Sequence, residues 1–310
     1  MDTLPNVSES FWLNTVDLPR FPKLERDLQV DVAIIGGGIS GITSAYCLAK
    51  EGLRVALLER DRLLWGTTGH TTAKLTVQHG LIYDELIHSL GEEKAKVYYD
   101  ANQEALKFAE NLITKGEIDC DFTVEDAYIY AEDEKSVHKL EKEMEAYAKL
   151  GIKGSLVENI PLPFKVKRAI VMPCQYQFHP LKYLLFLVKE IEKMGVEIYE
   201  NTPAVEGTED NRAKVRTKDG HIIASDYVLS CSHFPFYDKG FYFARMYPER
   251  SYVVAAFIEE TFPGGMYLNA EDPTRSIRYT PCKGQKLLLF GGDHHKTGQG
   301  ISTEQHYENL

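Results

Sequence analysis

The spacing of three glycines near the start of the chain constrains its fold more than any other feature of the sequence. The apolar run of residues 30–35 breaks at Gly36, and Gly36, Gly38 and Gly41 have the spacing G-x-G-x-x-G. From Ile39 to Lys50, apolar side chains recur at intervals of three and four residues, which predicts a helix. The glycines therefore mark a tight turn between a buried strand and a helix.

A second apolar run, Val55–Leu58, follows this helix and ends at Glu59. A strand, a crossover helix and a second strand form a βαβ unit, which implies a parallel sheet. The glycine spacing is typical of dinucleotide binding, in which the turn lets the backbone approach a pyrophosphate and the helix N-terminus, here Ile39, faces the phosphates. Glu59 can accept hydrogen bonds from ribose hydroxyls. These residues leave FAD and NAD open and disfavour NADP, because Glu59 would repel its 2′-phosphate.

The rest of the chain alternates between helical and strand-like segments. Apolar spacing predicts further helices, and short alternating runs predict a β-meander, an exit strand and a second sheet. The helices are expected at about 98–116, 137–151 and 181–194, the meander at 196–223, the exit strand at 227–230, and the second sheet at 253–258, 276–279 and 286–290. The fold class is therefore α/β, with a Rossmann-like domain that has a parallel sheet plus a β-meander, and an interleaved α+β domain.

The chain is acidic and has few cysteines. Of its 310 residues, 35 are Lys or Arg and 46 are Asp or Glu, so the net charge of −11 argues against nucleic acid and anionic membrane surfaces as partners. The 5 cysteines include no C-x-x-C pair, as expected for free thiols in a reducing compartment. The apolar windows are far shorter than the roughly 20 residues of a membrane-spanning helix. We therefore expect a soluble, cytoplasmic protein.

The segment from Gly66 to Thr76 reads G-T-T-G-H-T-T-A-K-L-T and is soon followed by Gln78-His79-Gly80. Here the sequence resembles the FAD-dependent oxidoreductases of the D-amino-acid oxidase and glycine oxidase superfamily. It is most similar to the subgroup that carries a C-terminal Rieske iron–sulfur domain. His179-Pro180 and Gly291-Gly292 resemble later landmarks of this family. The resemblance covers about residues 10–310 and implies FAD as the cofactor.

The resemblance also implies which residues hold FAD. In the family, the loop after the acidic residue lies along the pyrophosphate and the flavin, and residues near position 205 bracket the adenine. The expected cofactor-binding residues are Gly36, Gly38, Ile39, Gly41, Glu59, Arg60, Thr67, Thr68, His70, Thr71, Thr72, Val205 and Gly292.

Three further residues carry more specific expectations. His70 lies where some amine dehydrogenases of the superfamily bind the flavin covalently; a non-covalent flavin contact and a structural role remain open. Lys74 is expected to place a positive charge near flavin N1 and the C2 carbonyl, where it would stabilise the anionic reduced state; the alternative is a solvated or ion-paired lysine. Arg278 is a candidate for bidentate binding of a substrate carboxylate, against an ordinary ion pair.

The chain departs from the family in two places that bear on metal binding. Many relatives end one strand in Ala-Thr-Gly, whereas this chain has Ser230-Cys231-Ser232. Cys231 and His233 have the C-x-H spacing of a Rieske site, but Cys282, the later cysteine, lacks the C-x-x-H that the site also needs. The adjacent His294 and His295 point in different directions on an extended chain. We therefore expect no metal site.

The end of the chain also differs from the family, which continues with a segment that makes the last flavin contacts. Ser302 and Gln305 form an S-x-x-Q capping box at the start of a short helix, and we expect a truncated enzyme whose hold on FAD is weakened or lost. The expected parts are an N-terminal lead (1–29), an FAD-binding domain (30–80 and 150–235, with 285–310 as its incomplete C-terminal part), a helical insertion (81–149) and a substrate-domain sheet (236–284).

The resemblance implies an FAD-dependent oxidoreductase that oxidises a C–N bond of a small amine or amino acid by hydride transfer to flavin N5. The electron acceptor stays open, and a Rieske domain outside this chain is one candidate. Two alternatives remain: a non-catalytic or inactive nucleotide-binding fragment, and an NAD-linked dehydrogenase.

Overall fold

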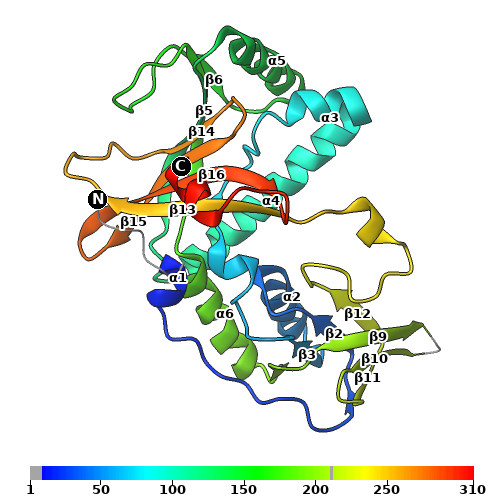
Figure 1. Ribbon diagram of the computed structural model, residues 1–310. Helices are drawn as coiled ribbons and strands as arrows, with labels where there is room; N and C mark the ends of the chain where they lie inside the picture. Colours follow the sequence, from blue (N-terminus) through cyan, green and yellow to red (C-terminus); the bar gives the residue numbers. More distant parts are fainter. Residues whose placement is uncertain (1–8, 210–211) are drawn as a thin grey trace. The chain divides into compact units, whose positions relative to one another are not determined.

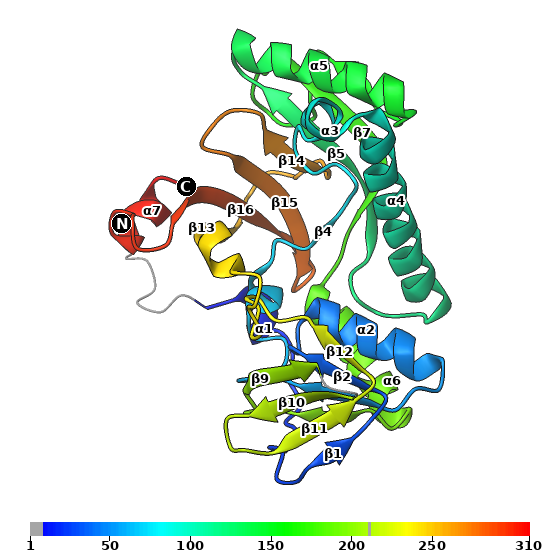
Figure 2. The ribbon, with the colours of Figure 1, turned by 90° about the vertical axis from the view of Figure 1, so that its right-hand side faces the viewer.

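The computed structural model describes residues 9–209 and 212–310. They form two compact units, shown in Figure 1 and, turned by 90°, in Figure 2. Unit 1 comprises the described residues of 1–71 and 180–247, and unit 2 comprises 72–179 and 248–310. Each unit is built from segments that are far apart in the sequence.

Unit 1 contains two four-stranded sheets and the helices around them. Its elements are α1 (Phe11–Asn14), β1 (Leu28–Gln29), β2 (Val32–Ile35), α2 (Ile39–Lys50), β3 (Val55–Leu58), the 3₁₀-helix η1 (Thr67–His70), α6 (Pro180–Lys193), β8 (Glu197–Tyr199), β9 (Ala204–Glu209), β10 (Ala213–Thr217), β11 (Ile222–Ser225), β12 (Tyr227–Ser230) and the 3₁₀-helix η2 (Tyr242–Arg245).

The first sheet of unit 1 is fully parallel, in the order β12-β2-β3-β8. Helix α2 connects β2 to β3 and packs against α6. Every residue of β2 and β3 is buried, because helices lie on one face of the sheet and the second sheet lies on the other. The βαβ unit predicted from the glycine spacing is confirmed, and α2 spans the expected residues 39–50.

The second sheet of unit 1 has the order β1-β11-β10-β9, in which β9, β10 and β11 form an antiparallel meander. β1 pairs with β11 in parallel. Ala33 and Ile35 of β2 share one apolar cluster with Val215 and Ile223 of the meander. This cluster is the core between the two sheets.

The strand at 197–199 corrects one expectation. It does not belong to the meander, because β8 pairs in parallel with β3 and extends the first sheet. The reason is local: β8 directly follows α6, so helix and strand together form a second crossover onto the parallel sheet. The meander begins only at β9.

Unit 2 is one eight-stranded sheet with helices on it, in the order β13-β16-β15-β14-β5-β7-β4 and with β6 beside β7. Most pairs are antiparallel, but β14 and β5 are parallel. The elements are β4 (Lys74–Leu75), α3 (Tyr83–Leu90), α4 (Glu92–Lys115), β5 (Thr123–Ala131), α5 (Glu134–Leu150), β6 (Ser155–Val157), β7 (Arg168–Gln177), β13 (Glu249–Phe257), β14 (Met266–Asn269), β15 (Arg275–Cys282), β16 (Gln285–Lys296) and α7 (Thr303–Glu308).

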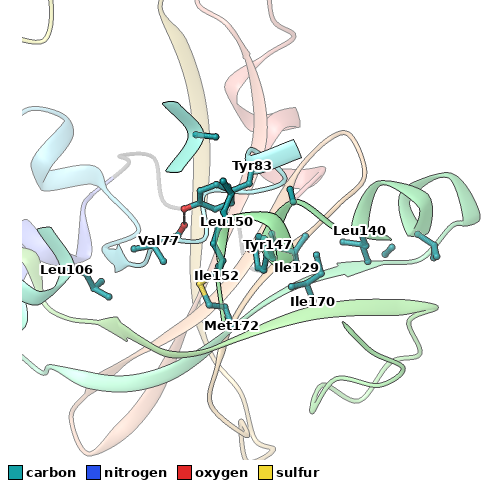
Figure 3. Packing of buried hydrophobic residues seen from close by; sticks show 14 of the residues in the cluster. Val77, Tyr83, Leu106, Ile129, Leu140, Tyr147, Leu150, Ile152, Ile170 and Met172 are labelled. Carbon is teal, nitrogen blue, oxygen red and sulfur yellow. Dashed lines mark hydrogen bonds between the residues drawn. The ribbon is translucent and has the colours of Figure 1, made fainter. Parts of the chain in front are cut away.

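The main core of unit 2 lies between this sheet and helices α3, α4 and α5. Figure 3 shows Ile129 and Ile170 of the sheet beside Leu140 and Tyr147 of α5. Tyr83 is completely buried in the same cluster, and its hydroxyl donates to the Val77 carbonyl at 2.6 Å. The hydroxyl is thereby satisfied inside an apolar core.

The boundaries between the two compact units differ from the expected domain boundaries. Residues 72–80, 150–179 and 285–310, expected in the FAD-binding domain, group with unit 2. The cause is strand pairing: β7 pairs with β5, and β16 lies between β13 and β15. Residues 236–247, expected in the substrate-domain sheet, group with unit 1.

A buried carboxylate joins two helices of unit 2. Glu143 of α5 is fully buried, and its oxygens accept hydrogen bonds from the backbone N–H groups of Tyr83 and Asp84, at 3.0 and 2.9 Å. These N–H groups open α3 and have no partner within that helix. Burial raises the pKa of Glu143, although the backbone hydrogen bonds partly oppose the shift. Glu143 thus caps a neighbouring helix from outside.

We predict that Glu143→Ala lowers the free energy of unfolding by about 2–4 kcal/mol, because it leaves the N–H groups of buried Tyr83 and half-buried Asp84 without an acceptor. Urea denaturation measures the change. Glu145→Ala, at an exposed position on the same helix, is the matched control and should stay within about 0.5 kcal/mol of the wild type. Equal stability of the two variants would contradict the capping role.

Candidate functional site

The glycine turn is held by two close backbone approaches. Gly36 has a φ of +114°, and a Cβ there would lie 2.6 Å from the Cys231 carbonyl oxygen. A Cβ on Gly41 would lie 1.9 Å from the Gly36 carbonyl oxygen. Larger residues are therefore excluded at both positions. The first turn of α2 is brought directly against the end of β2, as a pyrophosphate-binding turn requires.

A threonine loop lies against the N-terminus of α2. The N-cap of this helix is Gly38, which has no side chain to accept a hydrogen bond. Instead the Ile39 N–H donates to Thr68 Oγ1 at 3.1 Å, and a Cβ on Gly38 would lie 3.0 Å from the same oxygen. The structure thus brings together two groups of predicted cofactor residues, the glycine turn and the loop of residues 66–71.

Glu59 lies at the carboxyl end of β3 and holds the glycine turn in place. Its Oε2 accepts from the Gly37 N–H at 2.7 Å, and its Oε1 accepts from the Asp61 N–H at 2.9 Å. A carboxylate offers about four acceptor directions, so two such bonds leave capacity for hydroxyl donors. Arg60, in contrast, is exposed and pairs with Asp61 at 2.9 Å. Val205, on β9, is 44% exposed.

His70 is exposed at the end of η1, and its ring is oriented by its own loop. His70 Nδ1 lies 2.9 Å from the Gly66 carbonyl oxygen. A carbonyl only accepts, so the hydrogen-bond pattern assigns the proton to Nδ1 and leaves the lone pair of the neutral ring on Nε2. Nε2 is thus the nucleophilic atom of this side chain.

The segment after β12 belongs to this site, although sequence reasoning did not include it among the cofactor residues. Cys231 donates its N–H to the Ile35 carbonyl at 2.8 Å and lies against Gly36. His233 Nδ1 lies 3.4 Å from Thr67 Oγ1. The signal was available: a strand parallel to β2 must end beside the turn that follows β2. Burial raises the pKa of the Cys231 thiol.

Two cations of unit 2 lie around Ala73. Arg278 on β15 is 1% exposed and donates from Nη1 to the Ala73 carbonyl at 2.6 Å. Ala73 has a φ of +54°, an unusual conformation for a residue with a side chain. Lys74, the next residue, has a pKa lowered to about 8 by burial and by repulsion from Arg278. Burial lowers the pKa of Arg278 to about 9.

The late glycine pair and the histidines after it lie in β16. A Cβ on Gly291 would lie 3.4 Å from the Thr72 methyl group, and one on Gly292 would lie 2.5 Å from the Thr274 carbonyl oxygen. Of the pair, Gly291 is therefore the one whose backbone lies beside the predicted residue Thr72.

His294 and His295 have separate surroundings. His294 is exposed and lies 4.0 Å from an Asp272 oxygen. His295 stacks on His306 with a centroid separation of 4.2 Å, and its Nε2 lies 3.0 Å from the Tyr252 hydroxyl. Across residues 9–209 and 212–310, no three His, Cys, Asp or Glu side chains are arranged to hold a metal ion. In the same part of the chain, no helix has the length and apolarity needed to cross a bilayer.

Comparison with known proteins identifies the family. The sequence profile of the family described as FAD dependent oxidoreductase matches residues 31–310. The chain is 48% identical over 303 residues to the putative Rieske 2Fe-2S iron-sulfur protein YhfW of Bacillus subtilis, covering 97% of this chain and 60% of that protein. It therefore spans less than two thirds of that relative.

Two further similarities concern enzymes. The chain is 25% identical over 215 residues to gamma-glutamylputrescine oxidoreductase of Escherichia coli, covering 67% of this chain and 50% of that enzyme. The crystal structure of glycine oxidase from Geobacillus kaustophilus has the same fold, with a TM-score of 0.64, 20% identity, and coverage of 89% of this chain and 75% of that one. The chain belongs to the family of FAD-dependent oxidoreductases that includes D-amino-acid oxidase-type enzymes, and FAD is its cofactor.

Proposed function

We propose that this chain is the flavin-binding part of an enzyme that oxidises a C–N bond of a small amine or amino acid. The observation that carries the proposal is the pair of cations at Ala73: buried Arg278 holds the backbone that presents Lys74. The names of two similar proteins, glycine oxidase and gamma-glutamylputrescine oxidoreductase, point to amines and amino acids. When bound, FAD supplies the acceptor at N5 for the hydride that leaves the carbon next to nitrogen, and the imine product hydrolyses in water.

Unit 1 has a cradle that fits the adenosine and pyrophosphate of FAD. At Gly36 and Gly41 a Cβ would collide with backbone atoms, so glycine at these positions lets α2 begin directly at the end of β2. The N-terminus of α2 provides N–H groups and the positive end of the helix dipole. Glu59 stands at the carboxyl end of β3, where it is proposed to accept from ribose hydroxyls.

Lys74 is proposed to supply positive charge near the flavin ring. Arg278 is proposed to fix the position of Lys74 and to add its own positive charge. With a pKa of about 8, the Lys74 ammonium is mostly protonated at neutral pH and loses its charge as the pH rises through that value. Arg278 remains charged at neutral pH. The same two charges would attract a substrate that carries a carboxylate. Arg278 therefore stays a candidate for substrate binding, although its Nη1 already donates to the Ala73 carbonyl.

The electron acceptor is proposed to be an iron–sulfur domain outside this chain. The support is the name of the relative that is 48% identical, a putative Rieske protein of which this chain covers 60%. An inactive fragment that binds FAD without turnover is the competing function. It differs from the proposal in one observable, the reduction of the flavin by substrate.

We predict that the chain, supplied with excess FAD, shows the absorbance of bound flavin, and that one or more members of a panel of primary and secondary amines and amino acids bleach it under anaerobic conditions. A visible spectrum recorded before and after each addition makes the measurement. Absorbance that persists with every compound, in a chain that dithionite can still reduce, would favour the inactive fragment.

We predict that Lys74→Met slows substrate reduction of the flavin by roughly 10- to 100-fold, because a positive charge placed where negative charge develops is lost. In the wild type the rate of flavin reduction should fall as the pH rises through about 8, where Lys74 deprotonates. The variant should not show this decrease. Anaerobic stopped-flow mixing across pH gives both results. Lys107→Met, at an exposed position in unit 2, is the control. If the rate in Lys74→Met still falls near pH 8, the proposed role of Lys74 is refuted.

We predict that Gly41→Ala abolishes FAD binding by the chain supplied with excess FAD, since its Cβ would lie 1.9 Å from the Gly36 carbonyl oxygen. Flavin content per chain is measured after desalting, and far-UV circular dichroism checks that the chain is folded. Gly52→Ala is the control for backbone strain alone: its φ of +82° disfavours a side chain, but nothing lies within 4 Å of a Cβ there. A folded Gly41→Ala chain with full flavin content would place the cofactor elsewhere.

A further inference from the structure

We propose that Ser10 and Trp12 form a brace that fixes the conformation of the loop of residues 66–71 and thereby sets how tightly the chain holds FAD. The inference rests on the proposed placement of FAD at this loop. It assigns a positioning role to the segment before the first strand, which the sequence presented only as an N-terminal lead.

The brace is a pair of hydrogen bonds from α1 to loop carbonyls. Ser10 Oγ donates to the Gly69 carbonyl oxygen. Trp12 Nε1 donates to the Thr71 carbonyl oxygen at 2.7 Å. Trp12 is only 3% exposed, so its indole is packed in unit 1 as well as hydrogen bonded. The two donors are two residues apart, and so are the two carbonyls.

The loop also packs against α1 at Gly69. A Cβ on Gly69 would lie 3.3 Å from the Leu13 side chain and 2.7 Å from the Leu64 carbonyl oxygen. Leu13 of α1 therefore lies directly on the loop backbone, and a residue larger than glycine would push the two apart. The contact explains why a buried glycine interrupts a run of threonines at this point.

The other contacts of the loop lead to the glycine turn. Thr68 Oγ1 accepts from Ile39 N–H, the first residue of α2, whose N-terminus is proposed to face the FAD phosphates. A peptide group is planar and trans, so a carbonyl held in one direction points the next N–H in the opposite one. By fixing the Gly69 and Thr71 carbonyls toward α1, the brace fixes which way the neighbouring N–H groups of the loop point.

The brace depends on the loop as much as the loop depends on the brace. Helix α1 has 4 residues, far fewer than an isolated helix needs to be stable in water. Its N-cap is Ser10 itself, whose side chain also accepts from the Leu13 N–H. The segment is therefore ordered by its contacts with unit 1, and a ligand that stabilises the loop should also stabilise α1.

The test is a titration of apoprotein with FAD, followed by quenching of flavin fluorescence, for the full chain and four variants. Trp12→Phe keeps an aromatic ring and loses the N–H donor, and Ser10→Ala loses the hydroxyl. Ser10→Thr keeps the hydroxyl. Asn14→Ala is the matched control on the same helix, since Asn14 is exposed and its amide donates to the carboxylate of Glu9, which is also exposed.

We expect the dissociation constant for FAD to rise roughly five- to twentyfold in Trp12→Phe and in Ser10→Ala, because each leaves a carbonyl without its donor. Ser10→Thr and Asn14→Ala should stay within about twofold of the wild type. At saturating FAD, the visible circular dichroism of the bound flavin should differ from the wild type in the first two variants only, a signal that a loss of stability alone would not change.

Two outcomes would overturn the inference and can be told apart. If the wild type binds FAD and both Trp12→Phe and Ser10→Ala bind it equally well with unchanged dichroism, the brace is only structural and the placement of FAD stands. If the wild type takes up no FAD at all, the proposed cofactor site fails together with the brace.

Discussion

The contact between the Gly36 carbonyl and the backbone of Gly41 is the constraint on which the rest of unit 1 depends. The Gly36 carbonyl oxygen lies so close to Gly41 that a Cβ on Gly41 does not fit. This close approach places the first turn of α2 on the end of β2. Once that turn is set, the carboxyl ends of β2, β3 and β12 lie at one edge of a parallel sheet. Glu59, the 66–71 loop and the Ser230–His233 segment all follow strands or turns at this edge. A dinucleotide site can form there because the residues that follow each parallel strand all lie at the same edge of the sheet.

Three carboxylates each join separate segments of their own unit, and two of them, Glu143 and Glu200, are buried. Glu59 holds the glycine turn, Glu143 caps α3 from a neighbouring helix, and Glu200 accepts from the backbone N–H groups of Phe21 and Leu63, at 3.2 and 2.8 Å. In each case one side chain satisfies two main-chain donors that no regular element would satisfy. Such a carboxylate costs desolvation, which is repaid only while both donors stay in place. In unit 1, the segments at Gly37 and Leu63 are thus each held by one side chain.

The sequence predicted the parts of this structure that depend on neighbours in the chain. The glycine turn, α2, the buried strands and the Ser302 cap of α7 follow from local patterns, and all are present. The pairing of β8 with β3 was missed, because a three-residue strand reads the same in a meander and in a parallel sheet. The brace at Ser10 and Trp12, and the contact of Cys231 with Gly36, join residues far apart in the chain. The local sequence gives no sign of the brace, whereas the Cys231 contact follows only once the strand at 227–230 is placed beside β2.

The position of Trp12 has a spectroscopic consequence. The chain has 2 tryptophans. One donates to the loop carbonyl of Thr71, and the other, Trp65, directly precedes the loop and is 49% exposed, with the Arg62 guanidinium 5.0 Å from its ring. Both indoles therefore flank the same six residues, one inside the protein and one facing water. Their emission differs in colour, since a buried indole emits further to the blue than a solvated one. The chain carries two natural optical probes, one at each end of this loop.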